Sequence, residues 1–306
     1  MNIWVDANGW PIPPTVLLLS IIADILYFRG WHILMKEEQN EHRKTARISS
    51  LAPSSIAVPA KEQQGAWFWR GIFFLGAIVA LILASCAPID ILSGRLFWVH
   101  MVQHLLILSV MAPLLVAAAP LLPMWLGLPV RAQKLLLKLA TPPIRQVFYK
   151  VGHWLRQPAI SCAILVVGTW VWHWPPLYDF ALTNDFIHDW GEHLTFLAVS
   201  VLFWTQIIPS PPLPFRTGYM GRMICIGVAI AQNVVLAVLI GFASAPLYAP
   251  YAHPLSALGG LSAIQDQQFG AGIMWTFGDV PFGIAISVLV QRWLAVQDRK
   301  TAHELQ

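Results

Sequence analysis

Charged residues are scarce in this sequence of 306 residues, since Asp, Glu, Lys and Arg together make up only 11% of it. A soluble domain usually carries about 25% charged residues, and hydrophobic residues reach 57% here. This balance excludes an ordinary soluble domain. It predicts an all-α, polytopic membrane protein whose main solvent is the lipid bilayer. The sequence has no marked internal repeat or low-complexity tract, and we expect no nucleic-acid partner.

Cysteine is also rare, with three residues and no Cys-x-x-Cys pair. This spacing excludes a zinc ribbon and a redox-active dithiol. Cys86 falls at the expected outer end of a membrane span, whereas Cys162 and Cys225 fall near inner ends. No intramolecular disulfide can therefore form on the outer side. Cys86 is either a small buried apolar residue or a soft metal ligand.

Seven apolar runs predict transmembrane helices, because about 20 apolar residues cross the hydrocarbon core. They cover residues 14–34, 67–87, 97–118, 158–174, 189–208, 222–243 and 270–293. The first run contains Asp24 and Arg29 and lacks a basic segment before it, so we expect a span rather than a signal peptide. The predicted organisation is a first transmembrane helix over 1–35, a cytoplasmic loop over 36–66, a six-helix membrane core over 67–295 and a cytoplasmic tail over 296–306.

Basic residues are missing from one side of this arrangement. Eighteen of the nineteen Lys and Arg residues fall on one side of a seven-span topology, and only Arg95 falls on the other. The positive-inside rule makes the basic side cytoplasmic. We therefore expect an outside N-terminus and a cytoplasmic C-terminus in the inner (plasma) membrane of a bacterium. On the basic side, residues 129–140 suit either an amphipathic helix on anionic lipid or a short solvated connector.

The side without basic residues holds six of the ten histidines, namely His100, His104, His173, His188, His193 and His253. Polar groups that can bind a metal are costly at membrane depth, so their collection on one side indicates a functional site. His100 and His104 are four residues apart and project from one helical face, as a metal-binding pair does. Two interfacial histidines that only bond to their neighbours would show the same spacing.

The fifth span begins with two further histidines and a carboxylate. His188 and His193 are five residues apart, so we expect that they do not share one helical face closely. Glu192 and His193 lie deeper and are interpreted as the pair that faces the bundle. A carboxylate in this position can orient a ligating imidazole. His173 and His253 are interpreted as an aromatic-belt histidine and a loop histidine.

The seventh span carries carboxylates at two depths. Asp266 enters from the outside, with Met274 about two turns further in, whereas Asp279 lies close to mid-membrane. A buried carboxylate at that depth is expensive and requires a partner. Gln232 and Asn233 of the sixth span are the candidate partners. A polar cluster with a purely structural role would also explain these residues.

Several stretches resemble the CtaG family of bacterial cytochrome c oxidase assembly factors, namely HMVQHLLILSVMAPLL, WHWPPLYDFAL with HDWGEHLTFL, and DQQFGAGIMW. The resemblance covers roughly residues 65–295. It implies a polytopic membrane protein that is needed to form an active haem–copper oxidase, through copper delivery and not as an enzyme. The implied partners are oxidase subunits, extracytoplasmic copper carriers and the lipid bilayer. The matching site positions are His100, His104, His193, Asp266 and Met274.

Copper(I) prefers thiolate, thioether and imidazole ligands, and the outer side of this chain offers all three. We therefore predict a Cu(I) site on the outer face. Its expected ligands are Cys86, His100, His104, His193 and Met274. The residues expected to tune it from outside the ligand set are His188, Glu192 and Asp266.

Three other functions are compatible with the same residues. A membrane cytochrome would bind haem through two histidines. A zinc-dependent intramembrane hydrolase would use His100, His104, His193 and Glu192 to activate water. A copper transporter would use the same ligands for entry and would in addition depend on Asp279.

Overall fold

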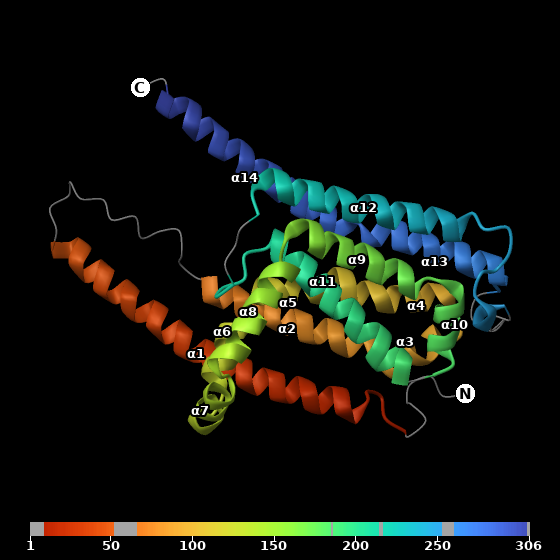
Figure 1. Ribbon diagram of the computed structural model, residues 1–306, viewed down its shortest axis with the longest axis horizontal. Coiled ribbons are helices and arrows are strands. Elements are labelled where there is room, and N and C mark those ends of the chain that lie inside the picture. The colour runs from red at the N-terminus through yellow and green to blue at the C-terminus, as the bar shows by residue number, and fades with distance from the viewer. Residues whose placement is uncertain (1–8, 52–65, 185, 214–216, 253–259, 305–306) are drawn as a thin grey trace.

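The computed structural model describes residues 9–51, 66–184, 186–213, 217–252 and 260–304, and it contains helices and no strand within these ranges. The elements are α1 (Pro14–Leu51), α2 (Ala66–Ala84), α3 (Ala87–Ser93), α4 (Phe97–Leu105), η1 (Leu106–Met111), α5 (Ala112–Ala118), α6 (Leu121–Gly127), α7 (Val130–Leu139), α8 (Pro142–Leu155), α9 (Pro158–Trp172), α10 (Pro175–Leu182), η2 (Ile187–Glu192), α11 (His193–Ile207), α12 (Tyr219–Gly241), η3 (Ala249–Tyr251), α13 (Ala263–Gly278) and α14 (Val280–Glu304). Figure 1 shows the long helices side by side, with α1 along one edge and α12 along the opposite edge. The prediction of an all-α protein is confirmed.

Several helices are long and apolar enough to cross a membrane. Within the described residues there are five, namely Pro14–Asn40, Ala66–Ala84, Phe97–Ala118, Tyr219–Gly241 and Ala263–Thr301. The pair α8 and α9, bent by 77°, adds a sixth if it forms one span. The chain is therefore a membrane protein. The predicted fourth and fifth spans correspond to α9 and to η2 with α11, and both the count of seven and the orientation of the termini stay predictions.

Helix α1 is longer than the sequence analysis predicted. We expected a loop from residue 36, but the helix continues to Leu51. Residues 36–47 consist largely of Lys, Arg, Glu and Gln, which are good helix formers, and they contain neither Gly nor Pro. No residue there stops the helix. The rest of the expected loop, residues 52–65, lies outside the described residues.

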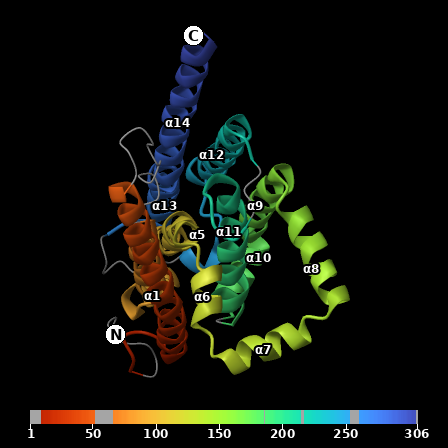
Figure 2. The same cartoon turned by 90° about the vertical axis from the view of Figure 1, so that its left-hand side faces the viewer.

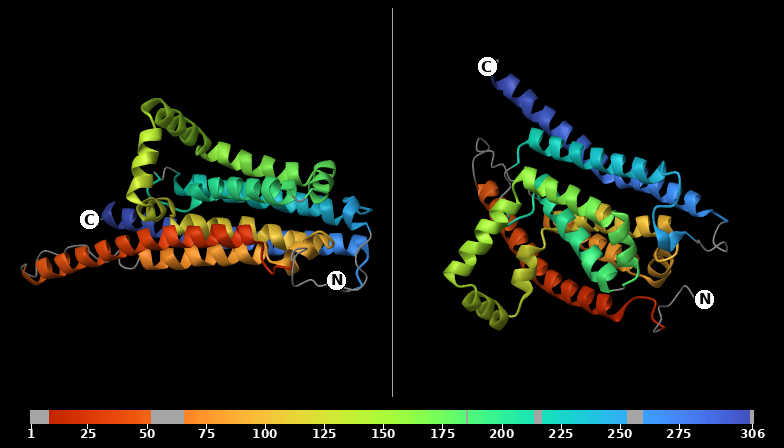
Figure 3. Two further views of the ribbon diagram at one scale, coloured as in Figure 1. Left: turned by 90° about the horizontal axis from the view of Figure 1, so that it is seen from below. Right: turned by 45° about the vertical axis from the view of Figure 1, so that its right-hand side comes forward.

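Helices α7 and α8 extend away from the bundle. Neither contains a buried residue. Figure 2 looks along the bundle and shows the two helices standing apart from the others, and Figure 3 shows them from two more sides. Residues 129–140 were expected to form either an amphipathic helix or a short connector, and the helix forms as α7. Its binding to anionic lipid stays a prediction.

Helix α1 packs against the short α6 through two glycines. A Cβ added at Gly30 would overlap the carbonyl group of Pro123, and one at Gly127 would overlap that of Leu26. We expect Gly30→Ala or Gly127→Ala to lower the free energy of unfolding by about 1–3 kcal/mol, because the backbones must move apart. The apparent melting temperature in detergent measures this loss. Gly227→Ala is the matched control, because its Cβ would meet no atom within 4 Å. If Gly30→Ala and Gly127→Ala melt at the same temperature as Gly227→Ala, the prediction is contradicted.

The span Phe97–Ala118 lies at the centre of the bundle, and α13 fixes its start. The backbone N–H groups of Phe97 and Trp98 donate to the carboxylate of Asp266 at 2.8 and 3.1 Å. These are groups that the first turn of a helix leaves without an internal partner. Helix α13 comes close here because Gly270 has no side chain, and a Cβ would lie 2.5 Å from the ring of Phe97. Asp266 thereby positions α4, whose next turn carries His100.

Two π-helical segments, η1 and η2, adjoin the site described below. In η1 the N–H of Ala112 donates to the carbonyl of Ile107, five residues earlier. The carbonyl of Leu108 would accept in the same way from the N–H of residue 113, but Pro113 has no N–H. Ser200 on α11 donates its hydroxyl to the Leu108 carbonyl at 2.8 Å instead. The π segment before Pro113 thus ties the central span to α11.

Candidate metal centre

Two histidines of α4 face one carboxylate of η2. Glu192 Oε1 lies 3.4 Å from His104 Nε2 and 3.9 Å from His100 Nε2. The three side chains are buried, and each offers a ligand atom within 4.8 Å of the others. We call His100, His104 and Glu192 the inner triad. We expected Glu192 to tune the site from outside the ligand set, whereas the structure places its Oε1 within 4 Å of the Nε2 atoms of both imidazoles.

A second group adjoins the inner triad on η2 and the start of α11. His188, Asp189 and His193 also offer ligand atoms within 4.8 Å of one another, and we call them the outer group. The His188 and His193 ring centroids are 4.4 Å apart. We expected these two residues, five apart, not to share one helical face closely. This was wrong, because η2 is π-helical and five residues there complete about one turn. Both histidines therefore belong to the site.

Hydrogen bonds fix which nitrogen of His100 faces Glu192. The hydroxyl of Tyr251 lies 2.6 Å from the carbonyl of Ser93 and 3.0 Å from His100 Nδ1. A carbonyl cannot donate, so the tyrosine proton lies toward Ser93 and His100 Nδ1–H donates to the tyrosine oxygen. Burial raises the pKa of Tyr251 well above its usual value, so the hydroxyl keeps its proton. The Nε2 of neutral His100 is then a bare lone pair beside Glu192.

The same arrangement recurs at two more histidines. His188 Nδ1 donates to Asp189 Oδ1 at 3.3 Å, while its Nε2 lies 4.0 Å from Glu192 Oε2. His173 Nδ1 donates to the carbonyl of Thr169 at 2.8 Å. In each ring the outward nitrogen donates a hydrogen bond, and the other nitrogen is free to bind a metal ion. Outward hydrogen bonds of this kind orient ligating imidazoles in metal sites.

The atoms that face inward lack hydrogen-bond partners among the described residues. They include both oxygens of Glu192 and the Nε2 atoms of His100, His104, His173, His188 and His193. Buried polar atoms without partners are costly, and a buried carboxylate is the most costly among them. A cation held among these lone pairs would satisfy them together. The residues present therefore fit a metal ion.

The other predicted ligands lie elsewhere. Cys86 precedes α3 and donates its thiol to the Leu83 carbonyl at 3.0 Å, and within the described residues it belongs to neither group that could hold a metal. Met274 lines a small cavity of about 50 Å³, together with Met101, His104 and His173. Its thioether therefore borders the site from the membrane interior.

The two carboxylates of the seventh span have separate roles. Asp266 caps α4, as described above, so it acts on the site through the helix. Asp279 follows α13 and accepts a hydrogen bond at 3.0 Å from Asn233, which was one of the two candidate partners. The Nδ2 of Asn233 also donates to the Met274 carbonyl at 3.0 Å. Asp279 is thus part of a polar contact between α12 and the end of α13.

Sequence reasoning missed two contributors. His173 was interpreted as a belt residue, but its side chain is buried, with its ring centroid 6.1 Å from that of His104. Tyr251 gave no signal, because it lies in a short 3-10 turn far along the chain. The Pro-Pro pair directly after Trp174 could have indicated a chain reversal that turns His173 inward. His253 lies outside the described residues.

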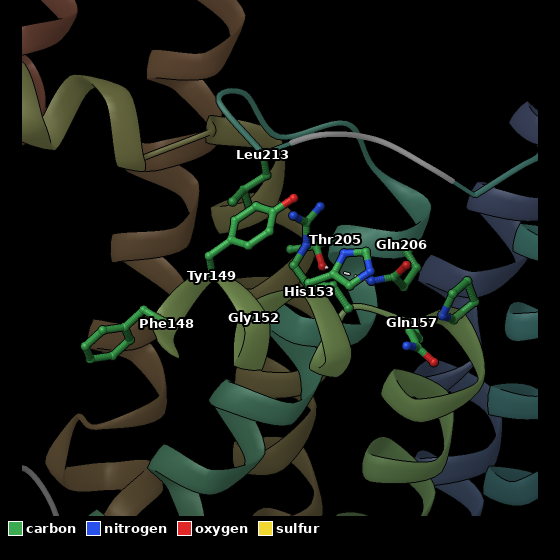
Figure 4. A pocket seen from close by; sticks show the side chains of 10 residues that line it. Phe148, Tyr149, Gly152, His153, Gln157, Thr205, Gln206 and Leu213 are labelled. Atoms are coloured by element: carbon green, nitrogen blue, oxygen red, sulfur yellow. Dashed lines mark hydrogen bonds between the residues drawn. The ribbon is translucent and has the colours of Figure 1, made fainter. Parts of the chain in front are cut away.

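A larger cavity, of about 350 Å³, lies at the other end of α9. Figure 4 shows Tyr149, His153, Thr205 and Gln206 around it. One histidine and no carboxylate line it, so its donor set does not fit a metal ion as the inner triad does.

Comparison with known proteins places the chain in a family. The family model of the cytochrome c oxidase caa3 assembly factor (Caa3_CtaG) matches residues 55–295. This chain is 26% identical, over 239 residues or 76% of its length, to uncharacterised proteins of Mycobacterium bovis and Mycobacterium tuberculosis. A protein of Mycobacterium leprae is also 26% identical, over 245 residues. The chain spans 35% of the length of these relatives. No solved structure matches it significantly.

Proposed function

The chain belongs to the family of cytochrome c oxidase caa3 assembly factors, and from this we propose that its inner triad binds one Cu(I) ion for delivery to a haem–copper oxidase. Delivery takes place at the outer face of a bacterial plasma membrane, to oxidase subunits and from extracytoplasmic copper carriers. The observation that supports the proposal best is the orientation of the imidazoles. The Nδ1 atoms of His100 and His188 are occupied outward while their Nε2 atoms face a buried carboxylate, and the Nε2 of His104 faces the same carboxylate.

The charge of the site favours a monovalent ion. Glu192 is buried among imidazoles, and Cu(I) bound by its carboxylate and by neutral imidazoles would give a site without net charge. A divalent ion would leave one positive charge in a region of low dielectric constant, which costs energy. Imidazole is a good ligand for copper, and the thioethers of Met101 and Met274 border the site with the soft character that Cu(I) prefers.

A zinc-dependent hydrolase is the second candidate, because two histidines and one glutamate also form the ligand set of some zinc enzymes. Space at the site disfavours it. The two cavities that border the histidines measure about 50 and 180 Å³, whereas sites for organic ligands usually measure about 300–1,000 Å³. The small volume of these cavities also disfavours a site for haem. A metal ion is the ligand that fits.

Copper retention tests the proposal. The purified full chain is loaded with Cu(I) without oxygen, and copper per protein is measured after passage over a competing chelator. We expect about one copper per chain for the wild type and less than about one tenth of that for His100→Gln/His104→Gln, since most of the ligand set is lost. The control is His32→Gln/His153→Gln, which removes two histidines outside the site. Equal copper in the two double variants would refute the inner triad as the binding site.

A further inference from the structure

The outer group leads from the inner triad to the protein surface. We propose that His188, Asp189 and His193 form a receiving site, where Cu(I) binds first and from which it passes to the inner triad. The inference rests on the proposed function, because it needs the inner triad as the destination. It adds a second binding site and assigns an entry route for the ion.

The π-helical turn builds the receiving site. His188 and His193 face each other at 4.4 Å between ring centroids, with an interplanar angle of 61°. In a regular α-helix two residues five apart would diverge, whereas the wider π turn aligns them. Asp189 accepts a hydrogen bond from His188 Nδ1. This leaves the Nε2 atom of His188 for a metal, and the Nε2 atoms of His188 and His193 are both buried without partners among the described residues.

Exposure falls in steps from the outer group to the inner triad. The side chain of Asp189 is 51% exposed and that of His188 is 11% exposed. His104 is 3% exposed and His100 is fully buried. An ion that arrives from water therefore meets a solvated carboxylate first and a dry site last. It can exchange its water molecules for imidazoles one at a time, which avoids the full cost of desolvation in a single step.

A cavity beside the outer group gives access to it. It measures about 180 Å³ and is lined by Asp90, Asp189, Trp190, Met111 and His193, with the start of α1 as a further wall. Two carboxylates at this opening attract a cation, because opposite charges raise the local concentration of an ion. Met111 adds a soft ligand on the wall. The cavity suits a copper ion but is too small for an organic substrate.

His188 connects the two groups. Its ring lies 4.4 Å from that of His193 and 5.1 Å from that of His100, and its Nε2 lies 4.0 Å from Glu192. In the transfer a bond from Cu(I) to an imidazole of the inner triad forms as the bond to His193 breaks. The copper keeps its oxidation state, and no proton needs to move. The inner triad holds Cu(I) more tightly, because its buried carboxylate balances the charge of the ion, so the ion moves inward.

Loading kinetics test the receiving site. Cu(I) is supplied as a coloured chelator complex to the full chain in detergent, and both the rate of transfer and the final copper content are measured. We expect His193→Gln to load about tenfold more slowly than wild type, because the ion loses an imidazole ligand of the receiving site and must bind the buried triad without it. Its final copper content should equal that of wild type. The matched control, His32→Gln, should load at the wild-type rate.

Each other outcome has a distinct meaning. If wild type takes up no Cu(I), the proposed function itself fails. If His193→Gln loads as fast as wild type, the receiving site is refuted while the inner triad stands. If His193→Gln both takes up Cu(I) more slowly and ends with less copper than wild type, His193 belongs to the inner site and the two-step route is refuted. Apparent melting temperatures must match for these comparisons, and Asp189→Asn provides a second variant if His193→Gln does not fold.

A direct titration without competitor examines the same site at equilibrium. The His100→Gln/His104→Gln protein should still bind one Cu(I), more weakly than wild type, through the outer group. Adding His193→Gln to that protein should abolish this weak binding. If the weak binding is absent before His193 is replaced, or persists afterwards, the outer group is not a copper site.

Discussion

A strain that carries Glu192→Ala in place of the natural chain is expected to lose copper from its cytochrome c oxidase, and with it most of the oxidase activity. The carboxylate oxygens of Glu192 lie 3.4–4.0 Å from the Nε2 atoms of His100, His104 and His188. Without it, Cu(I) would bring an unbalanced charge into a buried site. We expect the affinity for Cu(I) to fall more than about 100-fold, beyond the loss caused by replacing a residue that only orients a ligand.

Two controls separate copper delivery from a loss of the protein. Glu37→Ala removes an exposed carboxylate of α1 and should leave oxidase activity unchanged, at equal amounts of protein in the membrane. Excess copper in the medium should restore the activity of the Glu192→Ala strain, because other routes can then supply the ion. An oxidase that stays inactive with excess copper, or that retains its copper in this strain, would contradict the assignment of Glu192.

The pair His100 and His104 could be predicted because its geometry is local. Residues four apart on any α-helix lie on one face, and the rings are indeed 4.1 Å apart. The partner of Asp279 could also be named from sequence, since a carboxylate at mid-membrane requires a donor and Asn233 was one of few at that depth. Both inferences depend only on helix periodicity and depth in the bilayer.

The rest of the site depends on contacts that no local pattern encodes. The α-helical period placed His188 and His193 on different faces, and only the π turn of η2 brings them together. Asp266 was expected near the metal but binds the start of α4, 169 residues away in the chain. Tyr251 reaches His100 across 151 residues. Packing between distant segments decides these roles, and a single sequence read by itself shows none of it.

Replacing Tyr251 with phenylalanine should weaken Cu(I) binding about 10–100-fold, the usual cost of removing a group that orients a ligating histidine. The oxygen of Tyr251 accepts from His100 Nδ1, while its proton goes to the carbonyl of Ser93. Phenylalanine keeps the packing of the ring and removes these two bonds, together with the bond at 3.4 Å that Tyr251 accepts from the hydroxyl of Tyr178. His100 can then adopt the other tautomer, in which Nε2 carries the proton and cannot bind the metal.

A matched substitution and a double variant distinguish this role from a loss of stability. Tyr248 is also a buried tyrosine, but its hydroxyl donates to the carbonyl of His173 at 3.1 Å. Tyr248→Phe removes a buried hydroxyl without touching His100, so it should lower the melting temperature similarly and change the Cu(I) affinity less. In a His100→Gln background, Tyr251→Phe should have no further effect on affinity, since the ring that it orients is absent. If the two losses of affinity simply add, Tyr251 does not act through His100, because independent sites are additive and coupled ones are not.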